Sequence, residues 1–139
     1  MTNFKKLKLF SLVVVLVITA ASGEFFRQLN GRADFTLRSP RGDYLIESVP
    51  LGGVLFPLRD KVFVRVVDAT RPGEVYRTPL YAASMLDMRS PHETEGELSI
   101  TWVTFDKARQ SFSLGVPGWQ GTWLNFFVAN VPYEITPNE

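Results

Sequence analysis

The most reactive side chains of the sequence form a short acidic segment around its single histidine. His92 is followed by Glu93, Glu95 and Glu97, a grouping that suggests either a general base or a divalent-cation loop. The alternating glutamates lack the Asp/Asn ladder and the turn glycine of a calcium loop, and one histidine cannot complete a site that needs two imidazoles. We therefore interpret this segment as a solvated acidic loop.

The sequence gives little support for covalent or hydrolytic catalysis. It has no cysteine, no serine stands in a Gly-x-Ser-x-Gly motif, and only His92 could serve as a base. Asp60 and Asp87 form a carboxylate pair only if the fold brings them together. We expect a protein that is not an enzyme and that has no cofactor and no metal. A small envelope hydrolase using Asp60, Asp87 or His92 is kept as an alternative.

Two apolar groups are candidate binding surfaces. Trp119 stands in a loop, residues 115–121, whose glycines and prolines offer few side chains to cover an indole. This indole either binds a peptide, a sugar or the membrane interface, or it folds back and plugs the open end of the domain. The same two alternatives apply to Leu55 and Phe56, at the apolar tip of an earlier predicted loop.

Length and charge limit the class of protein. A chain of 139 residues holds one domain at most. Residues 24–139 carry 12 basic and 14 acidic side chains, a net charge of −2, so no binding of nucleic acid is expected. The absence of cysteine excludes a disulfide scaffold and a lipid anchor on a lipobox cysteine.

The elements that would position these residues begin with a membrane segment. Lys5, Lys6 and Lys8 precede an uncharged stretch, Leu9 to Gly23, whose 15 residues reach about 22 Å as a helix, less than the hydrocarbon core of a bilayer. This length is typical of a signal peptide, and residues 19–23 offer small side chains for cleavage. Glu24, Phe25 and Phe26 instead resemble the interfacial end of a retained helix.

Both alternatives predict the same topology. The three lysines stay cytoplasmic and the rest of the chain crosses the membrane. We divide the sequence into a signal peptide or single transmembrane anchor (1–26), a linker (27–33) and an extracytoplasmic β domain (34–139). The expected location is the inner membrane, contacted through residues 9–26 with the β domain in the periplasm, or the periplasm or exterior if the segment is cleaved.

From residue 35 the sequence alternates apolar and polar side chains, as β-strands do. Strands are predicted over 35–38, 44–49, 62–68 and 74–78, and Gly42 provides the positive φ of the first hairpin turn. The segment 62–68 is apolar on both faces, so we place it in the centre of a sheet. Residues 80–97 break the alternation and predict a long crossover with one or two helical turns.

The C-terminal half returns to strands. Leu98, Ile100 and Trp102 are expected on one buried face, and 111–114 forms the returning strand of a hairpin that turns at 106–109. Residues 122–128 are apolar on both faces and predict a buried strand, while the tail adds at most a short edge piece. The expected core residues are Phe35, Leu37, Ile46, Val64, Val66, Val75, Ile100, Trp102, Phe112, Leu114, Leu124 and Phe126.

The predicted fold is mainly β: an N-terminal hydrophobic helix followed by a small antiparallel β-sandwich or partly open barrel of about six to seven strands. The segment from Phe35 to Glu47, with Ser39-Pro40-Arg41-Gly42-Asp43-Tyr44 at its turn, resembles a group of bacterial envelope proteins without an assigned activity. They pair one N-terminal membrane helix with a β domain that opens on a Ser-Pro-x-Gly-x-Tyr hairpin. The resemblance implies topology and fold, and this chain has Arg41 where the group usually has Asp or Asn.

We therefore expect a non-enzymatic interaction module of the bacterial cell envelope, membrane-tethered or periplasmic. Its partner would be an envelope protein, bound through a sheet edge or the Trp119 loop. The alternative is a periplasmic inhibitor or immunity protein that sets Glu93, Glu95 and Glu97 against the basic site of a toxin or hydrolase. The sequence indicates neither the identity of the ligand nor the oligomeric state.

Overall fold

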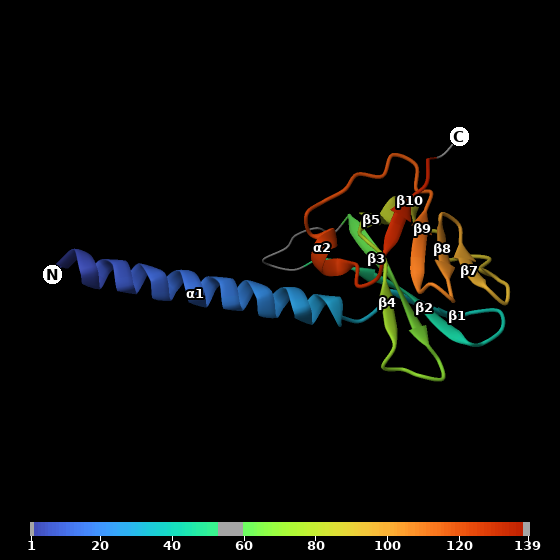
Figure 1. The fold of residues 1–139 in the computed structure, drawn as a ribbon, viewed down its shortest axis with the longest axis horizontal. Helices are drawn as coiled ribbons and strands as arrows, with labels where there is room; N and C mark the ends of the chain where they lie inside the picture. The colour runs from blue at the N-terminus through green and yellow to red at the C-terminus, as the bar shows by residue number, and fades with distance from the viewer. Residues whose placement is uncertain (1, 53–59, 138–139) are drawn as a thin grey trace.

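A long N-terminal helix leads into a β domain built from two sheets (Figure 1). The structure is a computed structural model and describes residues 2–52 and 60–137. In chain order, the elements of this part of the protein are α1 (Thr2–Leu29), β1 (Phe35–Arg38), β2 (Tyr44–Pro50), β3 (Lys61–Asp68), β4 (Val75–Arg77), β5 (Tyr81–Ala82), the 3-10 turn η1 (Ala83–Met85), β6 (His92–Glu93), β7 (Glu97–Ile100), β8 (Val103–Asp106), β9 (Ser111–Leu114), α2 (Asn125–Val128) and β10 (Tyr133–Ile135).

The first sheet has the order β1-β2-β3-β4, with β5 also paired to β3. The predicted hairpin is confirmed: β1 and β2 are antiparallel, and Gly42 has a φ of +83° in the turn between them. The Ser39 hydroxyl accepts a hydrogen bond from the Tyr44 amide at 3.1 Å and closes the same turn. Strand β3 lies in the centre of the sheet, as its apolar character on both faces predicts.

The second sheet has the order β10-β9-β8-β7-β6. Its hairpin β8–β9 confirms the predicted turn after Asp106, but the expected single strand through Leu98, Ile100 and Trp102 is wrong. Thr101, with a φ of +40°, and Trp102 form a two-residue turn that ends β7 and starts β8. Because the chain reverses there, Val103 and Phe105 enter the core and Trp102 is 38% exposed.

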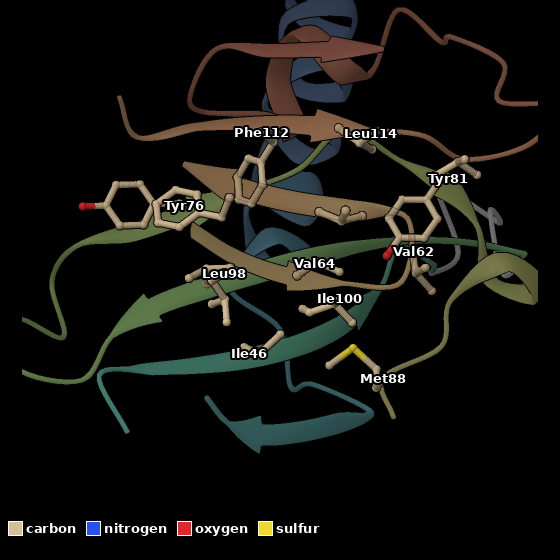
Figure 2. Packing of buried hydrophobic residues seen from close by; sticks show 14 residues of the cluster. Ile46, Val62, Val64, Tyr76, Tyr81, Met88, Leu98, Ile100, Phe112 and Leu114 are labelled. Atoms are coloured by element: carbon tan, nitrogen blue, oxygen red, sulfur yellow. The ribbon is translucent and has the colours of Figure 1, made fainter. Parts of the chain in front are cut away.

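The two sheets pack face to face around the main core (Figure 2). Val62, Val64 and Val66 of β3 meet Ile100, Phe112 and Leu114 of the second sheet in one buried cluster. Among the expected core residues, Ile46 is also confirmed, while Phe35 is exposed and Leu37 and Val75 are half-buried. The predicted β-sandwich is therefore confirmed.

The described residues hold ten strands, more than the six to seven expected, and they form an open sandwich rather than a closed barrel. Two of the additional strands, β5 and β6, are two-residue pairings in segments where alternation is too brief to detect, and the third, β10, is a three-residue strand in the tail. Strand β10 runs parallel to β9, so the second sheet is mixed. It is the short edge piece expected of the tail.

A third layer covers the outer face of the first sheet. Phe63 of β3 points away from the sandwich core and packs with Phe25 and Leu29 of α1 and with Leu124 and Val128. The helix α1 continues to Leu29 without a break, three residues past the boundary expected at residue 26. Its last turn is thus part of the folded domain.

The segment 122–128 is not the predicted buried strand. It contains the short helix α2, which begins after Leu124 and is closed by hydrogen bonds from the Val128 amide to the Leu124 carbonyl and from the Ala129 amide to the Asn125 carbonyl. Leu124, Asn125 and Val128 share the buried side of this turn, and Phe126, an expected core residue, is exposed. The physical reason is that one side of the segment packs on α1 and β3, so its other apolar side chains point outward.

Candidate functional site

The end of α1 is built into the β domain. Phe25 is 6% exposed and Leu29 only 1% exposed, although most other residues of the apolar helix are exposed. The Phe25 ring meets the Phe127 ring edge to face, with centroids 6.2 Å apart. The hydrophobic helix and the sandwich therefore form one packed unit at this point.

Arg65, on the outer face of β3, holds the last turn of α1. Its Nη1 donates to the Leu29 carbonyl oxygen and its Nη2 to the Gly31 carbonyl oxygen, each at 3.1 Å. Its Nε donates to the Glu47 carboxylate of β2 at 2.5 Å, and both side chains are mostly buried. Carbonyl groups at a helix C-terminus lack partners within the helix and favour a nearby cation, so this guanidinium caps α1.

Exposed aromatic side chains gather on α2 and just before it. The helix α2 lies beside the end of α1 (Figure 1). Trp123 is 71% exposed, Phe126 84% and Phe127 49%. The Phe127 ring contacts both of the others, with centroid distances of 6.2 Å to Trp123 and 5.2 Å to Phe126. We call these three residues the α2 aromatic surface.

A groove separates the α2 aromatic surface from α1. It has a volume of about 260 Å³. One wall is formed by Ile18, Ala21, Ser22, Phe25 and Phe26 of α1, and the other by Trp123, Leu124 and Phe127. Among the described residues, these walls are almost entirely apolar and hold no charged side chain. Such a groove fits a hydrocarbon chain or an apolar side chain, and Ser22 and Trp123 supply the polar side-chain atoms among its described lining residues.

Trp119, the indole singled out in the sequence, packs back onto the domain. Its Nε1 donates to the Leu80 carbonyl oxygen at 3.0 Å, and its ring lies edge to face with Tyr133, centroids 6.4 Å apart. The side chain is half-buried against the main core. Of the two alternatives, this geometry supports the plug.

The acidic segment is divided by the fold. The Glu93 side chain is inaccessible to solvent; its carboxylate accepts from Lys107 Nζ at 2.9 Å and from the Arg41 amide at 2.6 Å. Burial raises the pKa of Glu93, but hydrogen bonds from Lys107, Arg41 and Ser39 outweigh it and hold this pKa below the ordinary value. Glu95 and Glu97 remain exposed, so two of the three carboxylates are available to a partner.

The other site residues predicted from the sequence do not form a site with the three glutamates. Leu55 and Phe56 lie outside the described residues. His92 is exposed on the edge strand β6, and Asp87 is paired with Arg89 at 3.0 Å. Asp87 lines a surface hollow that neither Asp60 nor His92 lines. Within residues 2–52 and 60–137, no three His, Cys, Asp or Glu side chains are grouped as metal ligands.

The α2 aromatic surface is not predicted from the sequence, because residues 122–128 have the apolar pattern of a buried strand. The signal was present in their spacing. Trp123, Phe126 and Phe127 stand at i, i+3 and i+4, the positions that share one face of a helix. In so short an apolar run, the two-residue period of a strand cannot be distinguished from the spacing of a helix. Only the contact with α1 decides between a strand and a helix.

Helix α1 is long and apolar enough to cross a membrane, a property that spanning helices and signal sequences share. It is 28 residues long, about 42 Å at the rise of an α-helix. Comparisons of the chain with protein families, with curated proteins and with solved structures find no match.

Proposed function

We propose that the chain is a non-enzymatic interaction module that α1 anchors in the inner membrane of a bacterial envelope. The observation that carries this proposal is the burial of Phe25 and Leu29 in the β domain. Because the end of α1 is packed against β3 and capped by Arg65, a membrane-anchored α1 fixes the position of the sandwich relative to the membrane. The domain is then held at the membrane surface by the packing of α1 on β3, and not only through the connecting residues 30–34.

Charge sets the direction of insertion in this proposal. Lys5, Lys6 and Lys8 lie at the free end of α1, and the lysines on that side of an apolar stretch stay in the cytoplasm. The β domain then lies on the periplasmic side. A fusion of alkaline phosphatase after Glu139 should be active and should stay with the membrane during alkaline extraction. An inactive fusion would contradict the topology.

Retention of α1 is supported by the local structure at the candidate cleavage positions. Residues 19–23 are helical without interruption, and the Thr19 hydroxyl donates to the Val15 carbonyl oxygen at 2.8 Å. Cleavage after Ala21 or Gly23 would also remove Ile18 and Ala21 from the groove wall. The α2 aromatic surface would then keep at most Ser22, Phe25 and Phe26 of that wall and would face water, which is unfavourable for exposed rings.

The open edge of the first sheet supports binding to an envelope protein. Among the described residues, β1 pairs with β2 on one side and with no strand on the other, and Phe35 is exposed on it. An unpaired edge binds an extended segment by adding a strand. A photocrosslinking residue at Phe35 should capture a discrete partner in intact cells, while the same residue at exposed Arg109 in the β8–β9 turn should not. Equal yields at both positions would argue against this edge.

A further inference from the structure

We infer that the α2 aromatic surface is a second membrane contact, inserted beside α1 into the outer leaflet of the inner membrane. The occupant of the groove between α1 and α2 is then the hydrocarbon of the bilayer lipids. This inference rests on the proposed function, because it requires that α1 spans the membrane. It adds what the anchor alone does not provide, a fixed orientation of the β domain.

The groove lies at the depth of membrane-embedded residues of α1. Ile18 and Ala21 line the groove together with Trp123, and both belong to the uncharged stretch from Leu9 to Gly23 that enters the bilayer. Ile18 precedes Phe25 by seven residues, about 10 Å along the helix axis. Trp123 therefore reaches the level of side chains that lie within the membrane, and an anchored α1 carries it there.

The chemistry of the surface fits that depth. Tryptophan and phenylalanine are favoured at the boundary between headgroups and acyl chains, where an apolar ring loses contact with water. Of the lining residues within 2–52 and 60–137, none is charged. The nearest charges on α1 are Glu24 and Arg27, which pair with each other at 2.7 Å and lie at the headgroup end of the apolar stretch.

The position of the groove favours lipid over a second protein. Its α1 wall is continuous with the exposed apolar face of the helix, from Phe10 to Ile18, that lipid tails must cover. A soluble partner would have to enter between the helix and the bilayer to reach Ile18. Lipid already surrounds α1 and reaches the groove without displacing anything else.

Two contacts in different elements hold a domain more firmly than one. Phe25 and Phe127 join α1 to α2 on the inside of the third layer, and the α2 aromatic surface faces the lipid beside them. Rotation of the β domain about the end of α1 would pull Trp123 and Phe126 out of the membrane. The sandwich is therefore held in one orientation above the bilayer.

The chain has no cysteine, so a single nitroxide label can report depth without any background substitution. The full chain is reconstituted in phosphatidylcholine and phosphatidylglycerol vesicles with the label at Phe126→Cys or, as a control, at Arg109→Cys. Both positions are exposed, so Phe126→Cys removes only the ring contact with Phe127 and Arg109→Cys only a surface ion pair with Asp106. Collision of the nitroxide with oxygen, which concentrates in lipid, is compared with collision with a nickel complex, which stays in water.

The label at residue 126 should be accessible to oxygen and protected from nickel, and the label at 109 should show the reverse. Equal, water-like accessibility at both positions would overturn the inference. If the chain nevertheless stays in the vesicles, the proposed anchoring by α1 still holds. A chain that is lost from the vesicles would instead contradict the proposed function. If protection at 126 disappears when the vesicles are diluted with excess lipid, a second copy of the chain covers the surface and the inference is wrong.

Discussion

The guanidinium of Arg65 donates from Nη1 to the carbonyl oxygen of Leu29 at 3.1 Å, so a residue of the central strand closes the end of the N-terminal helix. The same guanidinium pairs with Glu47 on the neighbouring strand. A substitution at this position therefore acts on both the sheet and the anchor.

Arg65→Lys should lower the free energy of unfolding of the full chain in detergent by about 1 to 3 kcal/mol. Lysine keeps the charge but cannot reach Glu47, Leu29 and Gly31 together, because its ammonium lacks the planar fork. Urea denaturation measures the loss. Arg109→Lys, at an exposed side chain, is the matched control and should change stability by less than about 0.5 kcal/mol. Equal effects of both variants would show that Arg65 does not cap α1.

Phe25 and Phe26 are neighbours with opposite environments, 6% and 59% exposed. Phe25→Ala removes a ring that packs on Phe127 and should cost about 3 to 5 kcal/mol of folding stability. Phe26→Ala should cost much less in the same detergent. The thermal unfolding midpoints of the two variants test this difference. Similar midpoints would mean that the end of α1 is not docked on the β domain.

Trp119 and Trp102, the two tryptophans outside the α2 aromatic surface, should differ in their contribution to stability, with Trp119 contributing more. Trp119→Ala removes the hydrogen bond to Leu80 and a ring packed on the core, and should lower stability by about 2 kcal/mol or more. Trp102→Ala, in the β7–β8 turn, should have the smaller effect because that side chain is 38% exposed. Circular dichroism melts of both variants decide the order. A larger loss of stability for Trp102→Ala would instead support the expectation that Leu98, Ile100 and Trp102 share one buried face.

Glu93 should make the domain sensitive to acid. Its hydrogen bonds from Lys107, Arg41 and Ser39 hold its pKa in the folded state below the ordinary value, in spite of burial. The ionised form therefore stabilises the fold at neutral pH, and this stabilisation is lost as the pH falls through the lowered pKa.

The difference in urea midpoint between the parent chain and Glu93→Gln should therefore shrink between about pH 7 and about pH 3. Glu95→Gln, at an exposed position, is the control and should show little difference at either pH. A difference for Glu93→Gln that is independent of pH would exclude an ionised Glu93 from the stability of the domain.

Alternation in the sequence predicts β1, β2 and β3 well, because each has a turn signal or an uninterrupted apolar run. It fails at Thr101 and Trp102, where a threonine with positive φ replaces the usual turn glycine and is held by a hydrogen bond from its hydroxyl to the Asp87 carbonyl. That bond joins residues far apart in the chain, so no local pattern announces it.

The candidate site could not be predicted for a related reason. Whether residues 122–128 become a strand or a helix depends on the buried face presented by Phe25, Leu29 and Phe63. The sequence predicts a membrane segment and a β domain as separate parts. It does not show that one packs into the other, and the α2 aromatic surface arises from that contact.

The most direct test of the account is the mass of the chain labelled from outside the inner membrane. Arg109→Cys supplies the only thiol of the variant, and spheroplasts are treated with a membrane-impermeant maleimide before intact-mass measurement. An anchored module predicts a labelled chain that still contains residues 9–23. A labelled chain that begins at Ser22 or Glu24, or a full-length chain without label, would contradict it.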